Sequence, residues 1–257
     1  MHTRTRTRIL THALAAAALL ALHAALAPAT ATAAAHKPDK PIELFNGKNL
    51  DGWLGCLQPK GNETAATWNV ADGILHVTGQ PNGYLYTAKS YRDYKLTVEW
   101  RWSGPAPLGR DGKPRLRNNG VLLHMQSDDD ARLGVWPRSL EAQLQENNAG
   151  DFFVIAGVET AELRALRDKA LAAAGNDEKA RKNALNNRRI QKARDSSEKP
   201  VGEWNRYEIT CRADTVVLKV NGTEQNRATG LNVTEGRICL QTEGSAIQFR
   251  NVRLEPL

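Results

Sequence analysis

Polar side chains able to transfer protons or to bind hydroxyl groups recur at alternate positions within residues 118–155. Apolar and polar residues alternate in 121–126 and again in 140–145, which predicts two strands that each have one apolar and one polar face. The polar faces carry His124 in the first strand and Glu141 in the second, together with several amides. A water-exposed sheet face is the simplest explanation. A histidine, a carboxylate and amides are also what a sugar-binding cleft requires, so we predict such a cleft here.

Only an extended sheet can position these side chains, and the rest of the chain predicts one. Residues 94–102 alternate most clearly and place Trp100 and Trp102 on an apolar face, where we expect core. The dipeptides Asp72-Gly73 and Asn221-Gly222 predict tight hairpins. Short strands at even spacing, with turn dipeptides between them, predict an all-β sandwich or barrel.

One region departs from the strand pattern. Residues 158–194 are rich in Ala, Leu, Arg and Lys and contain no proline, which predicts helix with a break near Gly175-Asn176. We therefore expect an inserted helical segment near 159–198. A partner-binding surface and a lid are open alternatives for it, and an insertion without a role is the default.

The N-terminus has the features of a secretory signal peptide. Three arginines precede an Ala/Leu run, and small residues suited to cleavage follow it. His23 and Pro28 interrupt the run, which falls short of the ~20 apolar residues that a transmembrane helix needs. We expect a leader at 1–33, a folded domain at 41–257, a periplasmic or secreted location, and no membrane attachment after cleavage.

The formal charge of +7 does not describe the folded domain. The leader supplies three arginines and no acid, and residues 159–200 hold 11 Lys and Arg against 7 Asp and Glu. The remainder is close to neutral, so nucleic acid is not predicted as a partner.

Cysteine and acidic residues limit the redox and metal chemistry that we expect. Cys56, Cys211 and Cys239 allow at most one disulfide, and the apolar strands around the last two favour buried free thiols. Three consecutive acids at 128–130 leave a calcium site open, although a solvated loop is the simpler interpretation. No other cofactor is predicted.

Several motifs, in order, resemble the 3-keto-disaccharide hydrolase domain family, formerly a domain of unknown function. They cover most of the chain after the leader: ELFNGKNLDGW (43–53), NNGVLLHMQ (118–126), WPRSLEAQLQENNAGDFFVI (136–155), KPVGEWNRYEI (199–209), VNGTEQNRATGL (220–231) and GRICLQTEGSAIQFRNVRLEPL (236–257). The resemblance implies a concanavalin A-like jelly-roll sandwich of two curved antiparallel sheets whose concave face binds carbohydrate. It also implies substrates that are glycosides already oxidised at C3. The helical region departs from the family pattern.

The implied reaction starts from the acidity of the C2 proton beside a C3 ketone. A base removes this proton, the enolate expels the C1 substituent, and water adds to the enone. We expect His124 and Glu141 to transfer the protons. No second carboxylate is expected beside Glu141, which argues against hydrolysis by a carboxylate pair. A non-catalytic, lectin-like carbohydrate-binding module and a β-glucanase are the alternatives.

Residues around this pair are expected to contact an oligosaccharide or glycoside substrate. Amide and guanidinium groups would orient sugar hydroxyls or stabilise the enolate, and a tryptophan would stack on a ring. A glutamate after the strand at 237–241 is an alternative carboxylate. Packing within the loop or strand is the structural alternative for each residue. The expected set is Asn119, Gln126, Trp136, Arg138, Gln143 and Glu243.

Overall fold

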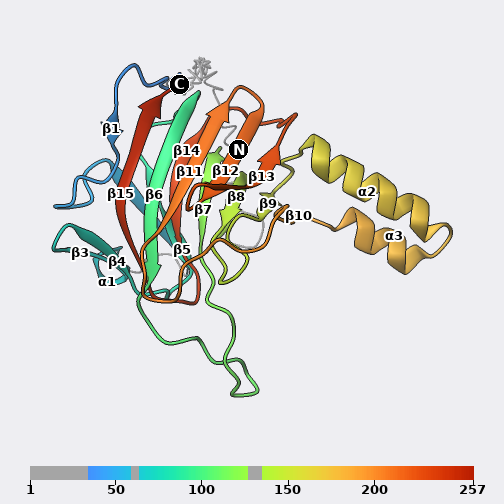
Figure 1. Cartoon of the computed structure of the whole chain (residues 1–257), viewed down its shortest axis with the longest axis horizontal. Coiled ribbons are helices and arrows are strands. Elements are labelled where there is room, and N and C mark those ends of the chain that lie inside the picture. Colours follow the sequence, from blue (N-terminus) through green and yellow to red (C-terminus); the bar gives the residue numbers. More distant parts are fainter. Residues whose placement is uncertain (1–33, 59–63, 127–134) are drawn as a thin grey trace, which may run out of the picture. The chain divides into compact units, whose positions relative to one another are not determined.

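Two antiparallel sheets lie face to face in the computed structural model and form a β-sandwich (Figure 1). The structure describes residues 34–58, 64–126 and 135–257. The expected leader at 1–33 and the acidic run at 128–130 lie outside the described residues. All the elements below belong to the compact unit Ala33–Leu257.

The first sheet has the strand order β13-β12-β11-β6-β15-β4-β3, and β1 pairs with β15. The predicted turns Asp72-Gly73 and Asn221-Gly222 join β3 to β4 and β12 to β13. All four turn residues have positive φ, as a tight two-residue hairpin requires. The strands are β1 (Ile42–Glu43), β3 (Trp68–Ala71), β4 (Ile74–Val77), β6 (Tyr94–Trp102), β11 (Asn205–Arg212), β12 (Thr215–Val220), β13 (Thr223–Ala228) and β15 (Ile247–Pro256).

The second sheet has the strand order β10-β9-β8-β7-β14-β5-β2. Two of its central strands, β7 and β8, contain the segments whose polar faces the sequence singled out. A short helix, α1 (Thr64–Thr67), precedes β3 of the other sheet. The strands of the second sheet are β2 (Trp53–Leu57), β5 (Gly83–Thr87), β7 (Gly120–Met125), β8 (Ser139–Gln143), β9 (Phe152–Ile155), β10 (Arg189–Ile190) and β14 (Arg237–Thr242).

Apolar side chains from the facing sides of the two sheets form the main core. Trp100 of β6 is fully buried there, as the alternation in its strand predicted. Leu140 and Ala142 of β8 also point into this core. Because side chains alternate along a strand, Glu141 and Gln143 must lie on the outer face of the second sheet.

A smaller apolar cluster covers part of that outer face. Two of its members, Trp136 and Ile155, lie beside the polar side chains of β8 and β14. Its buried members are Tyr84, Tyr86, Leu122, Met125, Val135, Trp136, Ile155 and Cys239.

The predicted helical insertion is present as a hairpin of α2 (Ala161–Ala174) and α3 (Glu178–Leu185), which projects from the sandwich in Figure 1. The side chains of Thr160 and Asp177 cap the two helix N-termini. The break falls at Gly175, where it was predicted. Helix ends earlier than predicted, because the chain after α3 returns to the second sheet as β10.

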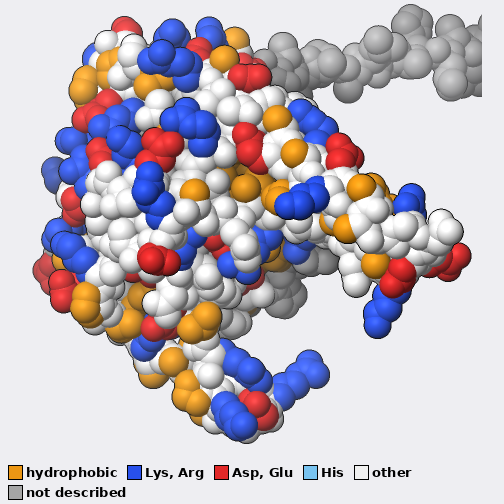
Figure 2. Space-filling view, turned by 45° about the vertical axis from the view of Figure 1, so that its right-hand side comes forward, with side chains coloured by type: hydrophobic (Ala, Val, Ile, Leu, Met, Phe, Trp, Pro, Cys, Tyr) orange, Lys and Arg blue, Asp and Glu red, His pale blue; other side chains and the backbone are white. Residues whose placement is uncertain are grey.

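None of the described helices is long and apolar enough to cross a lipid bilayer. Lysine, arginine and acidic side chains are interspersed over the face seen in Figure 2. All three cysteines of the chain are free thiols, and Cys211 and Cys239 are buried, as expected, whereas Cys56 is partly exposed.

Candidate functional site

A hollow of about 260 Å³ lies on the outer face of the second sheet, between the polar residues of β8 and the end of β14. Glu141 and Gln143 line it from β8, and Gln241 and Glu243 line it from β14 and the residues after it. Arg188, which immediately precedes β10, contributes a guanidinium. The hollow therefore combines two carboxyl groups, a cation and amides.

The strand between β8 and β14 leaves space for these side chains because it carries glycine at the point of contact. Gly120 of β7 is the register partner of Gln143. A Cβ atom on Gly120 would lie 2.5 Å from Gln241 Oε1 and 2.6 Å from Glu141 Oε1. The carboxyl and amide groups thus close directly over the Gly120 backbone, and a larger residue there would displace them.

The first sheet also fixes the end of β8. The buried Tyr207 of β11 donates its hydroxyl hydrogen to the Gln143 carbonyl oxygen and accepts a hydrogen bond from the Gly150 N–H at 2.9 Å. The Gln143 side chain accepts a hydrogen bond from the Gln145 N–H at 2.9 Å. A tyrosine of the main core therefore holds the backbone from which the amides of the hollow project.

Burial gives the two carboxyl groups unusual acidities. The pKa of Glu141, which is 7% exposed, is raised to about 8. Desolvation is the main cause, and the nearby charge of Glu243 adds to it. Desolvation raises the pKa of Glu243 to about 7, while the positive charge of Arg188 lowers the pKa of both groups. When Glu243 is ionised, its charge helps to keep the proton on Glu141.

Amide and aromatic groups complete the lining in a way that suits a sugar. The buried Oδ1 of Asn118 and Oε1 of Gln241 have no hydrogen-bond partner among the described residues. Buried acceptors are nearly always paired, so these two atoms each lack a donor that their surroundings would be expected to supply. The remaining lining residues are Trp136, Gln145, Phe153 and Ile155. Trp136 and Phe153 add aromatic rings to the lining.

His124 does not lie in the hollow, so the expected pairing with Glu141 is not formed. Its φ is 55°, and the register between β7 and β14 shifts at this point, which is a β-bulge. The bulge turns the ring inward, edge-on to Tyr94 at 6.0 Å between centroids, with Nδ1 3.0 Å from the Val233 carbonyl oxygen. Burial lowers its pKa to about 4. The predicted face of His124 is wrong because strict alternation stops at the bulge.

Three predicted substrate-binding residues also lie outside the lining of the hollow. Asn119 is fully buried, and because it directly precedes Gly120 it does not share the face of Gly120. Its Oδ1 accepts a hydrogen bond from the Gly120 N–H at 2.9 Å. The Gln126 side chain donates to two backbone carbonyl oxygens at 2.7 and 2.8 Å. The Arg138 carbonyl oxygen accepts a hydrogen bond from the Gln126 N–H at 3.1 Å. The Arg138 side chain does not line the hollow.

The other predicted substrate-binding residues, Trp136, Gln143 and Glu243, do line the hollow. Glu243 is a second carboxyl group beside Glu141, so the expectation of a single carboxylate is wrong. The alternation of β14, continued past its end, would have placed Gln241 and Glu243 on one face. Arg188 had no such signal, because its segment has a helical composition.

Metal-binding geometry is not seen in the parts of the chain that the structure describes. No group of three or more His, Cys, Asp or Glu side chains lies together there. The run at 128–130, which left a calcium site open, is outside the described residues. The groups that line the hollow suit hydrogen bonding and proton transfer.

Solved structures share this architecture. A protein from Parabacteroides distasonis, provisionally named a glycosyl hydrolase, aligns with a TM-score of 0.55 and 19% identity over 85% of this chain and 94% of that one. A β-glucanase from Bacillus licheniformis gives 0.51 and 9%, over 84% and 96%. A carbohydrate-binding module from Bacillus subtilis gives 0.50 and 12%, over 79% and 95%. These likenesses show the fold, a concanavalin A-like jelly-roll sandwich.

The family assignment has separate support. No curated protein matches the chain. A family model described as the 3-keto-alpha-glucoside-1,2-lyase-like domain matches residues 40–255, which include all the residues that line the hollow. The chain belongs to this 3-keto-alpha-glucoside-1,2-lyase-like domain family, the one that its motifs resemble.

Proposed function

We propose that this carbohydrate-active domain cleaves glycosides whose sugar already carries a ketone at C3. The observation that carries the proposal is the pair of Glu141 and Glu243 in one hollow, with pKa values of about 8 and about 7. The description of the family supports it, since it names a 3-keto-glucoside and a 1,2-lyase reaction. Two carboxyl groups with separated pKa values are suited to act as a base and an acid.

In the proposed first step, the ionised Glu243 accepts the C2 proton, and the electron pair of the C2–H bond forms a C2=C3 double bond. The C3 carbonyl becomes an enolate with its charge on O3. The enolate then reforms the ketone, its C2=C3 electron pair becomes a C1=C2 double bond as the C1–O bond breaks, and the protonated Glu141 gives its proton to the leaving oxygen. An enone and a free alcohol result.

Hydration completes the net hydrolysis. Water adds its hydroxyl group to C1 and gives its other proton to Glu141, while C2 regains a proton from Glu243. Both carboxyl groups return to their starting states. Trp136 and Phe153 offer ring faces for the sugar, and the unpaired acceptors of Asn118 and Gln241 bind its hydroxyl groups.

The test is turnover of a 3-keto-disaccharide, such as 3-keto-trehalose, beside the unoxidised sugar. Wild-type protein should release sugar from the oxidised substrate alone, and more slowly when C2 carries deuterium, because that bond breaks. Glu141→Gln and Glu243→Gln should each lower kcat by roughly 10²–10⁴-fold. Cleavage without a C2 isotope effect would argue against elimination.

The same carboxyl pair favours a second candidate, ordinary hydrolysis of an unoxidised glycoside by a general acid and a nucleophile or base. This activity would release reducing sugar from unoxidised β-glucan and would show no isotope effect at C2. A lectin-like module would bind sugar in the hollow and consume neither substrate. The paired assay therefore separates all three functions.

We propose a periplasmic or extracellular site of action. The support is the signal-peptide pattern of residues 1–33. Fractionation of cells that express the whole chain should recover a processed protein outside the cytoplasm, and an unprocessed cytoplasmic protein would contradict this.

A further inference from the structure

The inserted segment contributes a charged group to the hollow. Arg188 lies between α3 and β10, and its side chain lines the same hollow as Glu141 and Glu243. No hydrogen bond or ion pair engages its guanidinium among the residues that the structure describes. Its charge acts across the hollow on Glu141 and Glu243, and its N–H donors remain available to an anion or a developing negative charge.

The backbone of Arg188 is held on both sides. Its carbonyl oxygen accepts a hydrogen bond from the Val154 N–H of β9 at 2.9 Å. The preceding residue, Asn187, offers its carbonyl oxygen to Nε and Nη2 of Arg167 at 3.0 and 2.8 Å. Arg167 lies on α2 and also pairs with Glu159 at 2.6 Å. The base of the helical hairpin therefore fixes the position from which Arg188 projects.

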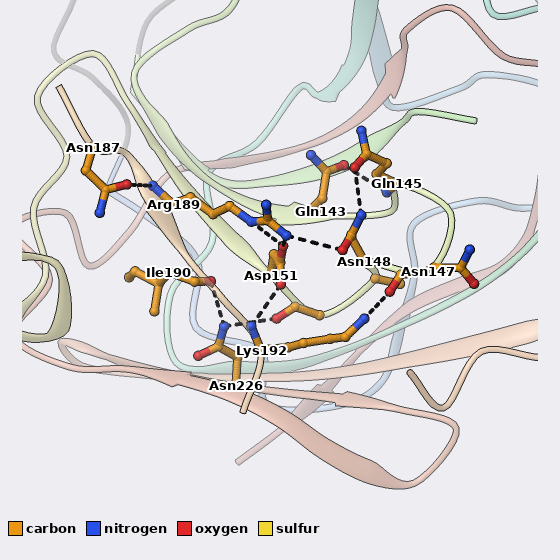
Figure 3. A network of polar contacts seen from close by, with 12 residues as sticks. Gln143, Gln145, Asn147, Asn148, Asp151, Asn187, Arg189, Ile190, Lys192 and Asn226 are labelled. Carbon is orange, nitrogen blue, oxygen red and sulfur yellow. Dashed lines mark hydrogen bonds and ion pairs between the residues drawn. The ribbon is translucent and has the colours of Figure 1, made fainter. Parts of the chain in front are cut away.

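The following residue anchors the segment to the sandwich. Arg189 donates from Nε to Asp151 Oδ2 at 2.6 Å, and its Nη2 lies 2.5 Å from the same oxygen. The Asp151 side chain is 1% exposed and also accepts a hydrogen bond from the Lys192 N–H at 2.8 Å. Figure 3 shows Arg189 reaching from β10 towards Asp151 and Asn148.

A chain of hydrogen bonds links this anchor to the amides of the hollow (Figure 3). Asn148 Oδ1 accepts a hydrogen bond from Arg189 Nη2 at 3.2 Å, and Asn148 Nδ2 donates to Gln145 Oε1 at 2.8 Å. The Gln145 N–H then donates to Gln143 Oε1 at 2.9 Å. The end of the insertion is thus connected to the wall of the hollow. An insertion without a role would not need this connection.

We infer that Arg188 is a catalytic residue that stabilises the enolate oxygen, and that the inserted segment serves to position it. This inference rests on the proposed function. When Glu243 removes the C2 proton, the electron pair ends on O3, where the charge is larger than in the ground-state ketone. A guanidinium held in place beside O3 stabilises that charge more than it stabilises the neutral substrate, so it lowers the barrier.

The experiment compares Arg188→Gln and Arg188→Lys with the wild type on a 3-keto-disaccharide. The matched control is Arg181→Gln, an exposed arginine on α3 away from the hollow. Arg188→Gln should lower kcat by ~10²–10³-fold with KM changed by less than about threefold, as for loss of one oxyanion donor. Arg188→Lys should recover part of kcat, and Arg181→Gln should match the wild type.

A pH–rate profile supplies a second readout that a merely structural role would not move. Because the charge of Arg188 lowers the pKa of Glu141 and of Glu243, both limbs should move to higher pH in Arg188→Gln and stay near their wild-type positions in Arg188→Lys. Wild-type kcat in Arg188→Gln, or a change in KM alone, overturns the inference. Absence of turnover by the wild type overturns the proposed function and this role with it.

Discussion

At the scale of single residues, the site works by withholding water from its acids. Glu141 is almost fully buried over Gly120, so its charged form is unfavourable. Glu243 is less buried and keeps the lower pKa. The pair therefore offers one base and one acid near neutral pH, and kcat/KM should follow a bell-shaped pH profile between about 7 and about 8.

The raised pKa of Glu141 has a consequence for stability. Its folded pKa of about 8 exceeds the ordinary value for glutamate, so the folded state binds the proton more tightly than the unfolded state. The associated stability is complete below about pH 4 and is lost as the pH rises to about 8. Glu141→Gln, which mimics the protonated form, should equal the wild type near pH 4 and exceed it by a few kcal/mol near pH 9 (on the order of 1.4 kcal/mol per pKa unit). Urea unfolding at both pH values measures this, and a difference independent of pH would contradict it.

His124 should prove structural. Its ring packs on Tyr94 inside the sandwich, so His124→Asn, which tolerates the positive φ, should destabilise the fold by about 1–3 kcal/mol and leave kcat within about threefold. Its pKa is lowered to about 4, so the wild type loses stability as the pH falls from about 6.5 towards 4. The variant should lose less over that range. A loss of kcat without a loss of stability would contradict this and would indicate that His124 takes part in catalysis.

At the scale of elements, the alternation of apolar and polar residues predicts which face a side chain occupies in a regular strand, and it fails where a bulge interrupts the strand. It placed Glu141 and Gln143 on the outer face correctly, since β8 has no bulge. It misplaced His124, because one extra residue in β7 reverses the faces beyond it and β7 itself carries no glycine or proline at the bulge. Apolar, β-branched and turn residues thus predict the sheets, while the bulge depends on tertiary packing.

The strand β10 was missed for a related reason. It has only two residues, and its composition continues that of the helices before it. What makes it a strand is the ion pair of Arg189 with the buried Asp151 and its pairing with β9. Such a contact joins residues far apart in sequence, so no local pattern could have revealed Arg188 as part of the site.

Asp151→Asn should loosen this element. It keeps the size of the side chain but removes the charge that holds Arg189, so we expect a loss of about 3 kcal/mol of unfolding free energy, at the lower end for a buried pair because Arg189 is 36% exposed. Hydrogen exchange at the Val154 N–H, which bonds to Arg188, should accelerate. The control Glu224→Gln breaks an exposed pair with Arg227 and should change stability by less than about 1 kcal/mol. Equal losses of unfolding free energy in Asp151→Asn and Glu224→Gln would show that the Asp151–Arg189 pair stabilises the fold no more than an exposed ion pair does.

At the scale of the whole molecule, the site depends on two apolar clusters separated by the second sheet. The main core fixes the strands, and the smaller outer cluster contributes Trp136 and Ile155 to the wall around the two carboxyl groups. If the two clusters unfold together, the raised pKa values persist for as long as the fold does. If the outer cluster opens by itself, water reaches Glu141 in a protein that is otherwise folded.

The free cysteines distinguish these cases, because Cys211 lies in the main core and Cys239 in the outer cluster. Burial raises the pKa of both thiols, that of Cys211 to about 12, so neither should react with a thiol reagent in the folded protein. In a Cys56→Ser background, which removes the partly exposed thiol, we expect both to become reactive at the same urea concentration. Peptide mapping after brief labelling measures this. Reaction of Cys239 at lower urea than Cys211 would show that the outer cluster opens independently, and the acidities of the carboxyl pair would then depend on a cluster less stable than the sandwich.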